Sequence, residues 1–137
     1  MRSIKAAKEV PRLPEEPESI CVLDDDTSVL KAMRRLLCSA GLRMMAFNDP
    51  RLFLEHAESR LISLAIIDIW MPEISGLEVQ RRLHDLAPAT PVIIMTGRDD
   101  QAVRSLVLQQ GAVAYFAKPF EDEALLSAIR AALPASS

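Results

Sequence analysis

Residues 61–76 read LISLAIIDIWMPEISG, an apolar run that ends in a single carboxylate, Asp68, ahead of a loop containing a proline. A run this apolar, followed by Pro72 and Gly76, predicts a buried strand, which we place at residues 61–67. Strands buried on both faces are typical of the middle of a parallel sheet. The stretch therefore predicts an open α/β fold with Asp68 at the carboxyl edge of a central strand.

Three other apolar runs also end in polar side chains: residues 20–26 (ICVLDDD), 91–97 (PVIIMTG) and 112–119 (AVAYFAKP). The carboxyl ends of parallel strands meet at one edge of a sheet, where open α/β proteins bind ligands. Asp24, Asp25 and Asp68 would then share one cleft with Thr96 and Lys118. Such a set suits Mg²⁺ and a phosphoryl group better than an organic substrate.

The rest of the sequence alternates between strand and helix patterns. We predict five strands, at 20–23, 42–47, 61–67, 91–95 and 112–117. Helical periodicity predicts helices at 27–40, from about 50 after an Asn48 or Asp49 cap, after Gly76, at 99–110 and at 121–133. This order predicts an α/β fold with a doubly wound, five-stranded parallel sheet.

Within the predicted helices, apolar spacing indicates which side chains face the core. On the fourth helix we expect Val103, Val107 and Leu108 to face inward and Leu106 to be exposed. The third helix should bury Leu86 at its end. Cys21 and Cys38 are expected to be buried without a disulfide or a metal, and His56 and His84 to lie on the surface.

Length and charge limit the classes of partner. A chain of 137 residues, half of them hydrophobic, is sufficient for one domain, which we place at 19–133. Its net charge of −3 argues against direct binding of nucleic acid or an anionic membrane. No signal or membrane-spanning segment is evident, so a cytoplasmic location is expected. Residues 1–18, with three prolines, are expected to form an extended or disordered arm, and 134–137 a tail or linker stub.

The chemistry follows from what a carboxylate needs to accept a phosphoryl group. Asp68 would attack phosphorus and become an acyl phosphate. The repulsion between the two anions requires Mg²⁺, which Asp24 and Asp25 would bind, with Asp68 and a nearby backbone carbonyl as further ligands. Lys118 adds a second positive charge and Thr96 a hydroxyl donor. With only four glycines, the chain has no dinucleotide fingerprint.

These motifs, together with the segment 68–72 (DIWMP), Thr96-Gly97 and Lys118-Pro119-Phe120, closely resemble the receiver domain of two-component response regulators. The resemblance covers about residues 19–133 and is nearest to receivers of nitrogen-fixation and nitrate-response regulators. It implies a flavodoxin-like fold with strand order 2-1-3-4-5, a role in signalling rather than as an enzyme, and a histidine kinase or phosphotransfer protein as partner.

The resemblance also implies residue roles. Asp68 would be the phosphoacceptor, and Asp24, Asp25 and the main-chain carbonyl of Trp70 would join it around Mg²⁺. Thr96 and Lys118 would contact the phosphoryl group, and Tyr115 would be an aromatic switch that turns inward when Thr96 moves. Phosphorylation would alter the surface of the fourth helix, fifth strand and fifth helix, where a homodimer or another partner could bind. The Lys118-Pro119 peptide should be cis.

Two side chains near the site distinguish this chain. Trp70 is bulky at a position that often carries a smaller or polar residue, and we expect its side chain at the mouth of the site. There it would slow the access of water or a phosphatase and lengthen the life of the acyl phosphate. Arg98, two residues beyond Thr96, is placed either to reach the phosphoryl group or an incoming partner, or to serve as an ordinary surface residue.

Two alternative functions stay open from the sequence alone. In a phosphatase of the haloacid-dehalogenase type, Asp24 would be the nucleophile and Asp26 the general acid, and turnover would survive Asp68→Asn. In a degenerate receiver, the fold would act by protein contact without phosphorylation. Such receivers generally lack one of the acidic pair, the acceptor or the lysine. All of these residues are present here.

Overall fold

The protein, described by a computed structural model over residues 19–133, alternates five strands with five helices. The strands are β2 (Ile20–Leu23), β3 (Met44–Phe47), β4 (Leu64–Asp68), β5 (Val92–Thr96) and β6 (Ala114–Ala117). The helices are α1 (Thr27–Ser39), α2 (Pro50–Ser59), α3 (Gly76–Leu86), α4 (Gln101–Gln109) and α5 (Asp122–Ala132). The predicted arm at 1–18 and tail at 134–137 lie outside the described residues.

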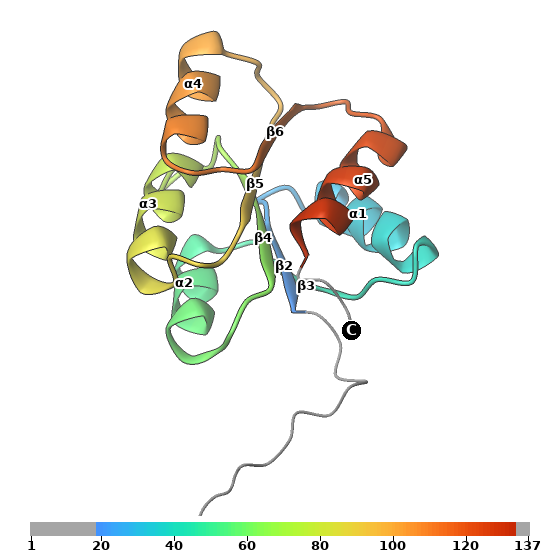
Figure 1. Cartoon of the computed structure of the whole chain (residues 1–137), viewed down its shortest axis with the longest axis horizontal. Coiled ribbons are helices and arrows are strands. Elements are labelled where there is room, and N and C mark those ends of the chain that lie inside the picture. The colour runs from blue at the N-terminus through green and yellow to red at the C-terminus, as the bar shows by residue number, and fades with distance from the viewer. Residues whose placement is uncertain (1–18, 134–137) are drawn as a thin grey trace, which may run out of the picture.

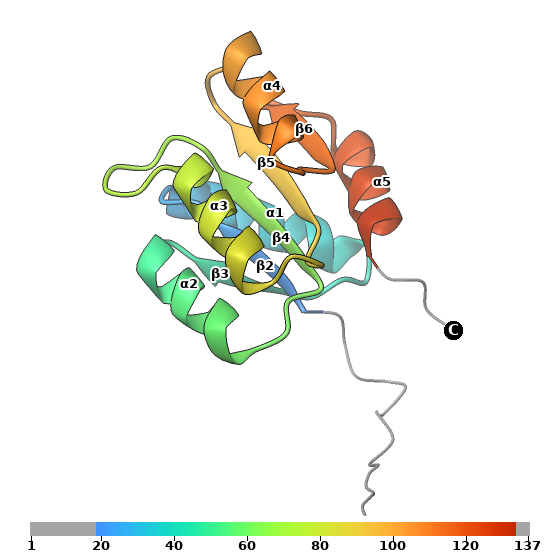
Figure 2. The same cartoon turned by 60° about the vertical axis from the view of Figure 1, so that its left-hand side comes forward.

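All strand pairs are parallel, and the order across the sheet is β3-β2-β4-β5-β6. Counted along the chain, this is the predicted order 2-1-3-4-5, so the predicted fold class is confirmed. Helices α2, α3 and α4 cover one face of the sheet and α1 and α5 cover the other (Figure 1). Turning the molecule brings α2 and α3 in front of the strands (Figure 2).

The register of the sheet brings the polar strand ends together. Leu23 pairs with Ile67, Asp68 with Met95, and Thr96 with Ala117. The Lys118 N–H donates to the Thr96 carbonyl at 2.7 Å, which extends the pairing by one residue. The four polar ends therefore lie at successive positions along one edge.

Several predicted boundaries shift by one to three residues. The central strand begins at Leu64 rather than at 61, and Leu61 is 82% exposed. The Ser63 N–H is bonded instead to the Ser19 carbonyl, at 2.8 Å, beside the start of β2. Helix α4 begins at Gln101 because Asp100 caps it, its carboxylate accepting from Ala102 N–H and Val103 N–H.

Four side-chain predictions were wrong. Leu86 and Leu108 are exposed, because the inward positions beside them are filled by Ala87 and Val107. Cys38 is exposed because it follows Leu37, the residue of α1 that faces the sheet. His56 is half-buried rather than on the surface, with its ring 5.3 Å from that of Phe47. The predicted burial of Cys21 and the exposure of Leu106 and His84 are confirmed.

Candidate acidic phosphoryl site

A cavity of about 340 Å³ opens at the carboxyl edge of the sheet. Its walls come from the ends of β2, β4 and β6 and from the loop after β5. The lining residues are Asp24, Asp25, Asp26, Asp68, Trp70, Gly97, Arg98 and Lys118. The strands thus bring together the charged groups that the sequence places far apart.

The three predicted metal-binding carboxylates form a cluster. Asp24 and Asp68 are 1% and 4% exposed, whereas Asp25 is exposed to solvent. One oxygen from each of these residues lies within 4.8 Å of the others. An octahedral Mg²⁺ with oxygens at about 2.0–2.1 Å places its ligands roughly 3–4 Å apart, so the cluster fits such an ion.

Lys118 supplies the positive charge inside this cluster. Its Nζ donates to Asp24 Oδ2 at 2.8 Å and to Asp68 Oδ1 at 3.2 Å. Burial of the ammonium by itself lowers the pKa of Lys118, but contact with two carboxylates outweighs this and raises the pKa above its usual value. Lys118 therefore stays charged at neutral pH and links the ends of β2, β4 and β6.

The environment of Asp68 disfavours its charged form. Burial and the nearby Asp24 carboxylate raise the pKa of Asp68 to about 6, against the opposing pull of Lys118. A second cation would stabilise the charged form of Asp68, because neighbouring carboxylates repel one another when they are all ionised. Asp68 is thus a carboxylate still ionised at neutral pH but held in a site that favours neutralisation.

Gly76 fixes the backbone behind Asp68. Its N–H donates to the Ile69 carbonyl at 2.8 Å, closing the loop that follows β4. A Cβ at this position would overlap the Asp68 carbonyl oxygen and lie 2.8 Å from Ile69 Cα. Only glycine allows α3 to begin this close to the strand, so this residue holds the loop tightly beneath Asp68.

The hydroxyl groups of Thr96 and Tyr115 are bonded away from the cluster of Asp24, Asp25 and Asp68. Thr96 is fully buried, and its Oγ1 donates to the Arg98 carbonyl at 2.8 Å and accepts from the Arg98 N–H at 3.0 Å. The Tyr115 hydroxyl donates to Asp99 at 3.0 Å and accepts from the Asp100 N–H at 3.3 Å. Both residues therefore hold the loop between β5 and α4.

Trp70 and Arg98 form one wall of the cavity mouth. The Arg98 guanidinium carbon lies 4.5 Å from the centre of the Trp70 ring, and Trp70 Nε1 donates to the Arg98 carbonyl at 3.4 Å. Trp70 is 40% exposed, so the expected position of its side chain at the mouth of the site is confirmed. The Lys118-Pro119 peptide is cis, as predicted.

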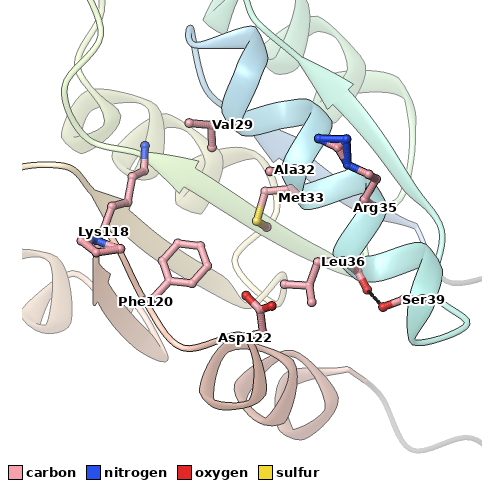
Figure 3. A pocket seen from close by; sticks show the side chains of 10 residues that line it. Val29, Ala32, Met33, Arg35, Leu36, Ser39, Lys118, Phe120 and Asp122 are labelled. Atoms are coloured by element: carbon pink, nitrogen blue, oxygen red, sulfur yellow. Dashed lines mark hydrogen bonds between the residues drawn. The ribbon is translucent and has the colours of Figure 1, made fainter.

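A larger cavity, of about 500 Å³, lies between α1 and the start of α5. Met33 and Leu36 of α1 face Phe120 across it (Figure 3), and Ser39 and Asp122 also line it. Lys118 is the residue that it shares with the acidic cavity. Its lining is mainly apolar, so this cavity suits a protein side chain rather than a phosphate.

The sequence reasoning missed the residues that hold the loop after β5. Asp99 and Asp100 bind the Tyr115 hydroxyl, whereas the helix predicted at 99–110 included both residues and assigned them no such contact. Gln80 was also missed: it is 2% exposed, and its Nε2 donates to the Val107 carbonyl at 3.0 Å, joining α3 to α4. A glutamine within a helix carries no sequence signal for such a contact.

Comparison with known proteins identifies the family. Residues 20–130 match the response regulator receiver domain. The chain belongs to this family. TodT, a response regulator protein of Pseudomonas putida, is 42% identical over 114 residues, which are 83% of this chain and 50% of TodT. FixJ, a transcriptional regulatory protein of Bradyrhizobium diazoefficiens, is 35% identical over 121 residues, covering 85% of this chain and 59% of FixJ.

The fold comparison agrees. A CheY-like receiver domain protein from Methanospirillum hungatei superposes with a TM-score of 0.80 at 28% identity, covering 85% of this chain and 93% of that one. The receiver therefore has a role in two-component signalling, and its family gives no support to the phosphatase alternative. The chain spans about half the length of TodT and FixJ. Within residues 19–133, no helix is both long and apolar enough to cross a membrane.

Proposed function

We propose that this receiver accepts a phosphoryl group on Asp68 from a histidine kinase or phosphotransfer protein, with Mg²⁺ as cofactor. The observation that carries the proposal is the cluster of Asp24, Asp25 and Asp68 around the Lys118 ammonium. In this assignment Asp24, Asp25, Asp68 and the Trp70 carbonyl bind the ion. Bound Mg²⁺ offsets the repulsion between the acceptor and the incoming phosphoryl group.

In the transfer step, an Asp68 oxygen attacks phosphorus, the bond from phosphorus to the donor imidazole breaks, and the imidazole leaves with the electron pair. Asp68 must be ionised to attack, which its pKa of about 6 permits at neutral pH. Lys118 already touches Asp68, so its ammonium is in place to bind a phosphoryl oxygen on the same carboxylate. The product is an acyl phosphate on Asp68.

Thr96 and Tyr115 carry the signal away from Asp68. The single hydroxyl proton of Thr96 is donated to the Arg98 carbonyl, so Thr96 has to leave that carbonyl to donate to a phosphoryl oxygen. This change frees the loop that also binds the Tyr115 hydroxyl and caps α4. The phosphorylated state then presents a different α4-β6-α5 surface, on which Leu106 and Leu108 are exposed contacts for a partner or a second copy.

The apolar cavity between α1 and α5 gives the phosphodonor a place to dock. It reaches Lys118, which binds the acceptor carboxylate, and Phe120 follows two residues later on its wall (Figure 3). A donor that packs apolar side chains between Leu36 and Phe120 would hold its phosphohistidine over the acidic cavity. Ala32→Arg, at an exposed position on the lining, should slow transfer from a protein donor and leave transfer from phosphoramidate unchanged.

The test uses Trp70, the only tryptophan in the chain. Its fluorescence is followed during addition of Mg²⁺ and then of beryllium fluoride, a phosphoryl mimic. We expect a saturable response to each ligand, with the second lost in Asp68→Asn and kept in the control Asp85→Asn, which alters an exposed carboxylate on α3. Incubation with phosphoramidate and Mg²⁺ should add one phosphate, detected by mass spectrometry, only where Asp68 is present.

A folded protein that responds to neither ligand and gains no phosphate would contradict the proposal. That result would favour the degenerate receiver, which acts through protein contacts without phosphorylation. A phosphate gained equally by Asp68→Asn would place the acceptor elsewhere.

A further inference from the structure

Arg98 is a cation at the mouth of the acidic cavity whose side chain has no carboxylate partner within the described chain. Its guanidinium lies over the Trp70 ring, 4.5 Å from the centre. Its backbone is held at the N–H and the carbonyl by the Thr96 hydroxyl, and the indole N–H of Trp70 approaches the same carbonyl. Both the side chain and the main chain of Arg98 are thus positioned by residues of the site.

The phosphorylated site would carry an excess of negative charge that a further cation can balance. In the phosphorylated state, the carboxylates of Asp24, Asp25 and Asp26 and an acyl phosphate dianion exceed the charge of a divalent ion and Lys118 by two negative units. A guanidinium binds phosphoryl oxygens with fixed, charge-assisted hydrogen bonds and is more weakly hydrated than an ammonium. Arg98 is the other cation on the cavity wall, so it is placed to balance part of this excess.

We propose that Arg98, held on the Trp70 ring, is a further phosphoryl-binding residue of this receiver. The inference rests on the proposed function and extends it to a residue of the loop after β5. The cation–π contact with the Trp70 ring keeps the guanidinium over the cavity in the unphosphorylated protein. The Arg98 side chain therefore loses little conformational freedom when its guanidinium moves to the phosphoryl group. When Thr96 turns toward the same group, it releases the Arg98 main chain, and the loop can follow.

The test measures two ligands of opposite charge by isothermal titration calorimetry, at low ionic strength. A cation at the mouth opposes Mg²⁺ and favours an anion. For Arg98→Ala we expect Mg²⁺ to bind about two- to threefold more tightly, and beryllium fluoride in saturating Mg²⁺ about tenfold more weakly. A mutation that merely loosened the loop would weaken both. Arg98→Lys keeps the positive charge, so its Mg²⁺ affinity should stay close to that of the wild type. Arg130→Ala, which alters an exposed residue at the end of α5, should change neither the Mg²⁺ affinity nor the beryllium fluoride affinity.

The contribution of the contact between Trp70 and Arg98 is tested by the same titrations. Trp70→Phe keeps an aromatic face and should remain close to wild type, whereas Trp70→Leu should lose several-fold in beryllium fluoride affinity. If Trp70 acts through Arg98, the double variant Trp70→Leu with Arg98→Ala should bind beryllium fluoride only slightly more weakly than Arg98→Ala alone.

Unchanged or tighter beryllium fluoride binding in Arg98→Ala would overturn the inference. If the wild type itself does not bind beryllium fluoride, the proposed function fails first, and the two failures are thereby distinguished. Equal weakening of Mg²⁺ and beryllium fluoride would assign Arg98 a structural role instead.

Discussion

The loops after β4 and β5 flank the same cavity but are built in opposite ways. The loop after β4 is anchored by packing: Ile69 and Met71 are 0% and 9% exposed and Gly76 is pressed against the Asp68 backbone, while Trp70 between them is 40% exposed. The loop after β5 is open: a Cβ added at Gly97 would meet no atom within 4 Å, and Arg98 is exposed. Hydrogen bonds with Thr96, Trp70 and Tyr115 hold this second loop in place.

This contrast matches two tasks that the proposed function requires. A nucleophile has to be held in one place, and close packing with glycine behind it does so because packed interiors resist small shifts. A switch has to exchange one set of contacts for another, and hydrogen bonds at a solvent-exposed loop can be exchanged at little net cost. The β4 loop suits the first task and the β5 loop the second.

The largest expected effect on stability comes from replacing Gly76 by alanine, with the same change at Gly97 as the comparison. Gly76→Ala should lower the free energy of unfolding by about 3 kcal/mol, because the new Cβ overlaps backbone atoms that cannot move aside. Gly97→Ala should change it by less than about 1 kcal/mol, since that position is open. Urea denaturation of both variants measures the difference. Equal losses would mean that the two loops are equally constrained.

The next effect concerns the charge of Asp68 in the absence of metal. The folded protein takes up a proton at Asp68 near pH 6, while the ordinary carboxyl value is 3.8. Between these values the folded state binds more protons than the unfolded state, so the contribution of Asp68 to stability falls as the pH rises. Asp68→Asn removes this loss. It should stabilise the protein by about 1–3 kcal/mol above pH ~7, and the gain should disappear toward pH ~4.

The measurement is thermal or urea unfolding in the presence of a chelator at several pH values. Asp85→Asn, which alters an exposed carboxylate, should show no comparable gain. A gain for Asp68→Asn that grows as the pH falls would have the wrong sign and would refute the assigned cause.

The sequence was sufficient for the tightly packed part of the molecule. Long apolar runs predicted the strands, and the family resemblance implied their order. The polar residues at the strand ends predicted the cluster of Asp24, Asp25, Asp68 and Lys118, because parallel strands fix where such ends meet. The residues around Asp68 were therefore found from the pattern of the chain together with a family resemblance.

The exchangeable contacts were not predictable in the same way. Nothing in the order of residues indicates that the Thr96 hydroxyl binds the Arg98 backbone, or that Tyr115 binds Asp99 and Asp100. These bonds depend on a loop conformation that short polar side chains select among several alternatives. The predicted burial of Leu86 and Leu108 was wrong for a related reason, because helical spacing alone does not show where the buried face of a helix ends.

A smaller effect tests whether Thr96 holds the open loop. Thr96→Val keeps the shape of the side chain but leaves the Arg98 N–H without its partner and the Arg98 carbonyl with only the Trp70 indole, which should cost about 1 kcal/mol. Thr90→Val is the matched control, because Thr90 Oγ1 donates to the Ile62 carbonyl at 3.1 Å, far from the site. We expect similar losses of stability from both. Only Thr96→Val should change the fluorescence of Trp70 and speed amide exchange at Arg98, measured by NMR.

The smallest effect is expected for Tyr115→Phe. Burial raises the pKa of Tyr115, so its hydroxyl stays protonated at neutral pH and continues to donate to Asp99. Both bonds of this hydroxyl lie near solvent, where water can replace them, so their loss should cost under about 1 kcal/mol. Amide exchange at Asp100 should nevertheless become faster, since its N–H loses the phenol oxygen. If exchange at Asp100 is unchanged, the cap of α4 holds the loop alone, and Tyr115 reaches the switch only through packing.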